Sequence, residues 1–520
     1  MTQKAARIVP NAGGIVSAGT AQAAAAGAAI LGAGGNAADG AVATALALAV
    51  SDPANCSFFG RGQFLWRDAE GRTEAVDGAT AVPRAARLPG VEGFAGAGIP
   101  GLPQAMAHLH ARHGRLPLAQ VAGPAIRLAE EGFAPGPQLG AVWKRLLPKL
   151  ARDPGAAVYL GDGDGTEPPR HFRHPRLAQL LRDFAAQGAA VLTAPERARA
   201  LAAAIRDRGG IWQAEDLIAN AARPGEVVTG RFRDCDITSI GRQGWGHTLI
   251  QMLAILDHLP PFGPELSADE ARRLILVIRH ALEDRPQYLG TLEPRADGIA
   301  LARLASTRHG ARRAEAIRAE LAALPAPQAL DPAALAAPSV TLDQDTTHAS
   351  VLDAAGNCVA FTCSIGPHFG QAVADPLHGV LLARSYQMET RPEPGTRDVT
   401  EMCPTVVTRD GKLLLALGAA GSERIPGAVM QVIVNMIDRG LSLEQALRFP
   451  RVTIKRDQPR VHGHAGAAVI GALGAWGQPP ELAGAGHVNH IGIVHAVGLD
   501  PAGRPVGGAD PAWDGAVHSA

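Results

Sequence analysis

Residues 344–370 read Gln344-Asp-Thr-Thr-His-Ala-Ser-Val-Leu-Asp-Ala-Ala-Gly-Asn-Cys-Val-Ala-Phe-Thr-Cys-Ser-Ile-Gly-Pro-His-Phe-Gly370, and their pattern predicts a β-hairpin. A first short strand begins near His348. The segment 353–357 has the composition of a tight turn, in which Gly356 is free to adopt a positive φ. The segment 358–365 is rich in β-formers and is expected to be the return strand.

The first strand begins with two threonines, Thr346 and Thr347. A threonine hydroxyl is a weak nucleophile unless a base lies beside it. Cutting the preceding peptide bond frees the threonine's own α-amine, which titrates at roughly 7.7–8.0 and can accept the hydroxyl proton. The hairpin alone also fits a simpler interpretation, in which both threonines are ordinary strand residues.

The segment 346–351, Thr-Thr-His-Ala-Ser-Val, with the Asp-Ala-Ala-Gly-Asn turn after it, resembles the nucleophile segment of the γ-glutamyltranspeptidase family. This family belongs to the N-terminal-nucleophile (Ntn) hydrolases. Other motifs that resemble family elements follow the same order along the chain, and the resemblance covers roughly residues 20–515. They include segments 34–43, 98–101, 410–412, 418–425 and 508–511.

The resemblance implies an α/β fold, the four-layer αββα sandwich of the Ntn hydrolases. It also implies a single precursor that cuts itself between Asp345 and Thr346. The products would be a large chain of residues 1–345 and a small chain of residues 346–520, which together form one globular unit.

The same resemblance assigns catalytic roles. Thr346 would be the nucleophile, and Thr347 and Ser364 would support its hydroxyl. Backbone N–H groups of Gly421 and Ser422 would stabilise the oxyanion, a role that suits N–H groups at the start of a helix. Ser364 taken alone is equally well explained as a strand hydroxyl.

The residues that hold a glutamyl group in the family are replaced in this chain. The clamp arginine corresponds to Ala79, and two serines correspond to Thr400 and Glu401. The residues that hold the substrate amine correspond to Gly366 and Ser385, with a third at Met388. A carboxylate at Glu401 would repel an anionic substrate group, so we expect glutamyl specificity to be lost.

Two arginines are candidates for a replacement cation. Arg61 stands in a segment, 60–63, where the family has only glycines, and Arg242 lies in a glycine-rich loop. A guanidinium suits bidentate binding of a carboxylate. We expect Arg61 to bind a carboxylate of the substrate, although an arginine among small residues also fits a surface position.

The composition indicates a globular protein. Its 49 basic and 49 acidic residues give zero formal charge, and 47% of the residues are hydrophobic. The chain therefore has no basic field for nucleic acid or an anionic membrane. The five cysteines are scattered and lack metal-ligand spacing, so we expect no disulfide framework, no metal and no other cofactor.

Residues 1–10 lack the apolar core of a secretory signal, and the apolar run 41–50 is too short to span a bilayer. Bacterial members of the family often carry an export signal, so we expect a cytoplasmic location. The expected partners are a small-molecule amide and the two chains of the precursor.

The motifs together predict a self-processing amidohydrolase that hydrolyses a small non-glutamyl amide, oxamate-like or acylase-like, through an acyl-threonine intermediate. One alternative is a γ-glutamyl hydrolase or transpeptidase that acts on glutathione-type substrates with a rebuilt clamp. A second is an uncut, non-catalytic scaffold.

Overall fold

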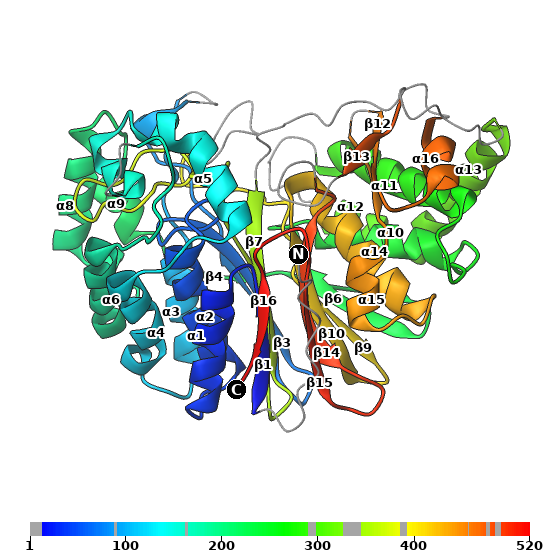
Figure 1. The fold of residues 1–520 in the computed structure, drawn as a ribbon, viewed down its shortest axis with the longest axis horizontal. Coiled ribbons are helices and arrows are strands. Elements are labelled where there is room, and N and C mark those ends of the chain that lie inside the picture. The colour runs from blue at the N-terminus through cyan, green and yellow to red at the C-terminus, as the bar shows by residue number, and fades with distance from the viewer. Residues whose placement is uncertain are drawn as a thin grey trace.

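The computed structural model describes residues 13–87, 91–161, 165–289, 298–325, 345–384, 393–455, 457–474, 479–483 and 490–520. Two β-sheets pack face to face, and helices cover the outer face of each (Figure 1). Apolar side chains from both sheets, including Leu65, Leu352, Val406 and Val497, fill the space between them. The predicted four-layer αββα sandwich is confirmed.

The first sheet is antiparallel and contains the predicted hairpin at its centre. Its strand order is β16-β1-β7-β8-β2-β3-β4. The strands are β1 (Gly14–Ala18), β2 (Arg61–Arg67), β3 (Thr73–Gly78), β4 (Arg223–Gly225), β7 (Asp345–Asp353), β8 (Cys358–Gly366) and β16 (Ala516–Ser519).

The second sheet has the order β15-β14-β10-β9-β6-β5. Its strands are β5 (Val227–Phe232), β6 (Cys235–Ile240), β9 (Thr405–Arg409), β10 (Lys412–Ala420), β14 (Ile493–Leu499) and β15 (Pro505–Ala509). A small sheet lies apart from both and contains β11 (Val452–Lys455), β12 (Gln458–His462) and β13 (Glu481–Ala483).

The helices form two groups, one outside each main sheet (Figure 1). Beside the first sheet lie α1 (Ala21–Gly32), α2 (Ala37–Ser51), α3 (Leu102–His113), α4 (Leu118–Glu131), α5 (Pro137–Leu150), α6 (Pro175–Gln187), α7 (Ala190–Thr193), α8 (Pro195–Arg206) and α9 (Ala214–Ile218). Beside the second lie α10 (Gly246–Asp257), α11 (Ala268–Leu289), α12 (Gly298–Leu304), α13 (Thr307–Ala323), α14 (Ile425–Ile437), α15 (Leu443–Arg448) and α16 (Ala467–Leu473). Within the described ranges, none of these helices has the length and apolar character of a membrane-spanning segment.

Side chains cap the starts of helices α1 and α2. Thr20 Oγ1 accepts a hydrogen bond from Ala23 N, and Asn36 Oδ1 accepts from the backbone N of Ala38. Asp353, in the hairpin turn, accepts a further bond from Ala37 N at 2.9 Å. The start of α2 is therefore tied to the turn between β7 and β8.

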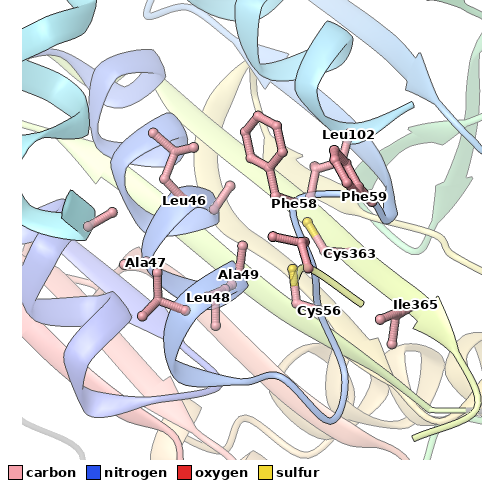
Figure 2. Close-up of a cluster of buried hydrophobic side chains, with 14 of the residues drawn as sticks. Leu46, Ala47, Leu48, Ala49, Cys56, Phe58, Phe59, Leu102, Cys363 and Ile365 are labelled. Carbon is pink, nitrogen blue, oxygen red and sulfur yellow. The ribbon is translucent and has the colours of Figure 1, made fainter. Parts of the chain in front are cut away.

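The segment after α2 packs on the helix-facing side of β8. Cys56 and Phe58 lie against Cys363 and Ile365 in the buried core (Figure 2). A hydrogen bond with Cys363, together with burial, raises the pKa of the Cys56 thiol. These contacts are apolar and close, so they fix the strand that lies next to β7.

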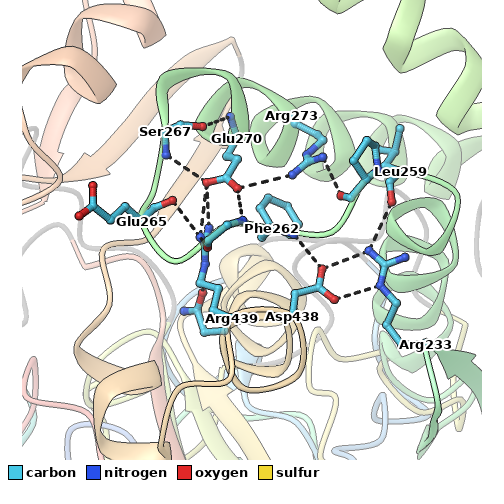
Figure 3. Close-up of polar contacts among 12 residues, drawn as sticks. Arg233, Leu259, Phe262, Glu265, Ser267, Glu270, Arg273, Asp438 and Arg439 are labelled. Atoms are coloured by element: carbon cyan, nitrogen blue, oxygen red, sulfur yellow. Dashed lines mark hydrogen bonds and ion pairs between the residues drawn. The ribbon is translucent and has the colours of Figure 1, made fainter.

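Charged groups fix the C-terminal end of α14 (Figure 3). Asp438 accepts hydrogen bonds from Arg233 Nε at 2.9 Å and from Phe262 N at 3.2 Å. Arg439, the next residue, lies 3.3 Å from Glu270 of α11. Since α14 begins just after Gly421, this network holds the helix that follows the predicted oxyanion turn.

Candidate active site

Thr346 lies in an irregularity of the pairing between β7 and β8. Asp345 pairs with Gly366 and Thr347 pairs with Cys363, so one residue of β7 is opposite two residues of β8. Bulges of this kind redirect side chains and are frequent beside active sites. The Thr346 side chain is directed to the second sheet, where its Oγ1 accepts a hydrogen bond from Gly421 N at 3.3 Å.

Gly421 and Ser422 turn the chain from β10 into the 3-10 helix η4 (Ser422–Arg424) and then α14. Gly421 has φ +133° and Ser422 has φ +53°. A Cβ at position 421 would lie 3.0 Å from His490 Cε1, so both backbone and space require glycine. The structure thus brings Thr346 together with the predicted oxyanion turn.

Glu401 lies beside this turn and is buried. Its Oε1 accepts a 3.4 Å hydrogen bond from Ser422 Oγ. The glycine-rich loop before α10 holds the neighbouring backbone, because Thr400 N donates to Gln243 O at 3.2 Å and Trp245 N donates to Met402 O at 2.9 Å. The loop therefore positions Thr400 and Glu401 next to the Gly421 turn.

Arg285, near the C-terminal end of α11, is a charged residue that sequence reasoning missed. Its guanidinium lies 4.0 Å from the centre of the Trp245 ring, and Nη1 donates to Thr248 Oγ1 at 3.1 Å. Burial lowers the pKa of Arg285 to about 9, while the charge of Glu401 opposes this shift. The charges of Arg285 and Glu401 therefore act on each other. No spacing in the sequence could indicate this proximity.

Thr347 follows Thr346 in β7, and Ser364 lies in the neighbouring strand β8. Ser364 Oγ accepts a hydrogen bond from Gly366 N at 2.9 Å. Thr347 Oγ1 is buried and has no hydrogen-bond partner among the described residues. A Cβ at Gly19 would lie 2.2 Å from that oxygen, so the Thr347 side chain packs on the glycine backbone. The roles of Thr347 and Ser364 in supporting Thr346 stay predictions.

His348 is a buried packing residue, although it follows the two threonines directly. Its ring nitrogens contact Thr362 Oγ1 at 2.8 Å and Ser350 Oγ at 3.0 Å. Burial, with a smaller contribution from His495, lowers the pKa of His348 well below its ordinary value. A neutral ring held by two hydroxyls fixes β7, and it leaves the α-amine of Thr346 as the predicted base.

Arg61 begins β2, and its guanidinium is paired with a carboxylate of the chain itself. Arg61 Nη1 lies 3.2 Å from Asp398 Oδ2, and both side chains are buried. Asp398 was not found by sequence reasoning, because it lies 337 residues from Arg61. The second candidate cation, Arg242, is exposed and pairs with Glu226 at 2.9 Å.

The positions that correspond to the glutamyl clamp differ in shape as well as in charge. Gly366 has φ +89°, and a Cβ there would lie 2.8 Å from Arg384 O. Ala79 is fully buried. Ser385, with Met388, lies outside the described residues. A larger side chain therefore does not fit at position 366 without a local rearrangement.

Comparison with known proteins places these features in a family. Residues 23–520 match the model of the family described as gamma-glutamyltranspeptidase. An acylase ACY 1 proenzyme from Pseudomonas sp. (strain V22) is 31% identical, over 94% of this chain and 90% of the relative. A glutathione hydrolase proenzyme from Escherichia coli (strain K12) is 27% identical, over 93% of this chain and 87% of the relative.

The fold also matches a solved structure. A cephalosporin acylase from Bacillus halodurans superposes with a TM-score of 0.86 and 24% identity, covering 100% of this chain and 97% of that one. This likeness concerns the fold and confirms the arrangement of the four layers.

Proposed function

Because this chain belongs to the γ-glutamyltranspeptidase family, and is therefore an Ntn-type hydrolase or acyltransferase acting on amide bonds, we propose that it hydrolyses a small non-glutamyl amide through an acyl ester on Thr346. The observation that carries the proposal is the 3.3 Å contact from Gly421 N to Thr346 Oγ1. It aims a backbone donor at the oxygen to which the acyl carbon would bond.

The first reaction would be self-cleavage. Thr346 Oγ1 attacks the carbonyl carbon of Asp345, the peptide C–N bond breaks, and an ester forms. Water then hydrolyses that ester, which leaves a carboxylate on Asp345 and a free α-amine on Thr346. The proenzyme names of the acylase and glutathione hydrolase relatives support such processing into two chains.

Substrate hydrolysis would repeat this chemistry. The freed α-amine takes the Thr346 hydroxyl proton while Oγ1 attacks the amide carbonyl. The N–H groups of Gly421 and Ser422 stabilise the oxyanion, and the amine product leaves with the proton. Water then attacks the acyl-threonine ester and releases the carboxylic acid. No cofactor enters either step.

The residues at the predicted clamp positions support an acyl group that is not glutamyl but is oxamate-like or acylase-like. Ala79 carries no charge, Glu401 brings a carboxylate, and Gly366 has no room for a longer side chain. A charged substrate group without a partner costs several kcal/mol, on the order of a thousandfold in affinity. The acylase relative, 31% identical, is consistent with this choice. A cytoplasmic location stays a prediction.

A second candidate is a γ-glutamyl hydrolase acting on glutathione, which the 27% identical glutathione hydrolase favours. The altered clamp predicts that γ-glutamyl anilides and glutathione are poor substrates. Glutathione hydrolysis near ~10 per second, a rate typical of ordinary enzymes, would support the second candidate instead.

The decisive experiment is N-terminal sequencing of the purified protein. We expect two bands on a denaturing gel, with the small chain beginning at Thr346. Thr346→Ala should remain a single band without activity, whereas Thr346→Ser, which keeps a hydroxyl, should still be cut. A small chain that begins at Thr347 would contradict the proposal and favour another nucleophile. A wild-type protein that stays uncut would also contradict it and favour a non-catalytic scaffold.

A further inference from the structure

Arg61 lies on the same face of the first sheet as the proposed nucleophile. Arg61 on β2 is directly opposite Ser364 on β8, and Ser364 is one of the two β8 residues opposite Thr346. Residues that pair directly across strands point to the same face, so Arg61 faces the same way as Ser364. Side chains two residues apart share a face, which adds Thr362, its direct partner His348 and, two residues before His348, Thr346. Adjacent strands are about 4.8 Å apart, so the backbones of Arg61 and Thr346 are about 10 Å apart.

The charge of Arg61 is bound by a carboxylate that the chain supplies. Arg61 Nη1 lies 3.2 Å from Asp398 Oδ2, and the exposed fractions of the two side chains are 9% and 6%. Thr80 Oγ1 donates to the same oxygen at 2.8 Å, and Asp398 N donates to Thr80 O at 3.0 Å. Arg61 Nε is buried without a hydrogen-bond partner among the described residues.

This arrangement has the chemistry of a carboxylate-binding site that is already occupied. An arginine and a hydroxyl together hold one carboxylate oxygen in a buried place two strands from Thr346, as they would hold an acidic ligand. We propose that Asp398 serves as an internal ligand of Arg61 and makes the acyl site select uncharged acyl groups. This inference rests on the proposed function and narrows its substrate class to amides whose acyl part carries no carboxylate, which favours the acylase-like acyl groups over the oxamate-like ones.

Electrostatics explains why Asp398 would exclude an acidic acyl group. A second carboxylate at Arg61 would lie beside Asp398, and like charges in a buried site repel strongly. Glu401, three residues further along the chain, adds another carboxylate near the Gly421 turn. Without the Asp398 charge, Arg61 would be a buried cation that favours an anionic ligand.

The test compares two substrates of equal size. The p-nitroanilides of succinic acid, which ends in a carboxylate, and of succinamic acid, which ends in a carboxamide, are given to wild type and Asp398→Asn. We expect the wild type to prefer the carboxamide. In the variant, kcat/KM for the carboxylate relative to the carboxamide should rise roughly ten- to hundredfold, the worth of a hydrogen bond to a charged group.

Two further variants separate specificity from folding. In the double variant Arg61→Met, Asp398→Asn, the kcat/KM ratio of the carboxylate to the carboxamide substrate should not rise, because the Arg61 cation is absent. Glu481→Gln is the matched control, since it breaks the buried Arg460–Glu481 pair in the small third sheet and should leave the substrate ratio unchanged.

The outcomes distinguish this inference from the proposed function. A self-cleaved Asp398→Asn protein that hydrolyses the carboxamide with an unchanged ratio overturns the inference and leaves the proposed function intact. A wild type that prefers the carboxylate also overturns it, and shows that Arg61 binds substrate directly. If no small amide is hydrolysed by the cut wild type, the proposed function itself fails.

A second test of the internal-ligand role measures stability and does not depend on catalysis. Asp398→Ala can be purified and melted with and without acetate, which would replace the missing carboxylate at Arg61. We expect acetate to raise the Tm of Asp398→Ala and to leave the Tm of wild type and of the Arg61→Met, Asp398→Ala double variant unchanged. A Tm of Asp398→Ala that acetate does not raise contradicts the internal-ligand role.

Discussion

At the scale of single residues, close packing around the hairpin is as important as the reactive groups. His348 is held between two hydroxyls, and Gly418 on β10 lies against its ring. A Cβ at position 418 would be 2.4 Å from His348 Cε1 and 2.6 Å from Nδ1. Both contacts are shorter than van der Waals distance, so the second sheet can approach β7 only because position 418 has no side chain.

Gly418→Ala should therefore destabilise the protein by about 1–3 kcal/mol, the usual cost of overpacking a core. Gly140→Ala is the control. Gly140 lies within α5, and a Cβ there would meet nothing within 4 Å, so alanine should stabilise by about 0.5–1 kcal/mol. Thermal melts should show a lower Tm for Gly418→Ala and a higher Tm for Gly140→Ala. An unchanged Tm for Gly418→Ala would contradict the packing argument.

The sequence predicted the reactive groups around Thr346 better than it predicted the charged residues that neighbour Arg61 and Glu401. Thr346, Gly421 and Ser422 come together as predicted, because each stands in a motif with a recognisable local pattern. The partners Asp398 and Arg285 could not be predicted. Asp398 meets Arg61 across 337 residues, and a charged residue in a polar segment normally indicates a surface position.

At the scale of elements, the helices of the second group depend on polar contacts at their ends. Asp438 closes α14 and joins it to the turn between β5 and β6 through Arg233, and to the loop before α11 through Phe262 N. Its side chain is only 3% exposed. One carboxylate thus satisfies donors from two other parts of the chain.

Asp438→Asn should cost about 1–3 kcal/mol, because it removes a charge from bonds made to a guanidinium. Asp236→Asn is the matched control, since Asp236 is 56% exposed and lies 3.6 Å from Arg231, and surface pairs contribute about 0–1 kcal/mol. Urea unfolding measures both changes. Self-cleavage should persist in both variants, because the network lies at the end of α14 away from Gly421.

Local signals in the sequence were sufficient for the hairpin. The predicted strand 358–365 is β8 with one residue more, and the strand predicted to begin near His348 is β7, which begins at Asp345. Helix α5 was missed, since prolines stand at its start and inside it. The short strands β1 and β16 were also missed, because their identity as strands depends on pairing with each other and with β7.

At the scale of the whole molecule, two buried histidines and one half-buried histidine make stability depend on pH. Burial lowers the pKa of His495 to about 4. Burial and the charge of Arg451 lower the pKa of His462 to about 3, and burial lowers the pKa of His348 well below its ordinary value. In the unfolded chain each would titrate near 6.5. Between pH 6.5 and the folded value, the unfolded chain binds the proton and the folded chain does not.

Stability should therefore fall as the pH drops through this window. His495 alone should account for about 3 kcal/mol between pH 6.5 and 4. Urea midpoints of the uncut Thr346→Ala protein at pH 7.5, 6.5, 5 and 4 measure this loss, and His495→Gln should make the midpoints depend less on pH. Midpoints that stay constant from pH 6.5 to 5 would show that these histidines are not buried as neutral rings.

The first and last strands of the molecule are neighbours, since β1 pairs with β16 and Ala520 N donates to Gly14 O at 3.0 Å. The two ends of the described chain could thus be joined by a short glycine–serine linker and the order of the polypeptide circularly permuted. A circularly permuted chain would begin at Thr346, continue through residue 520 and the linker to the original N-terminal part, and end at Asp345. In this chain β7 still lies between β1 and β8. Once its initiator methionine is removed, its nucleophile carries a free amine from synthesis. Such a chain would separate the chemistry of maturation from the chemistry of turnover, both of which the proposed mechanism assigns to the Thr346 hydroxyl.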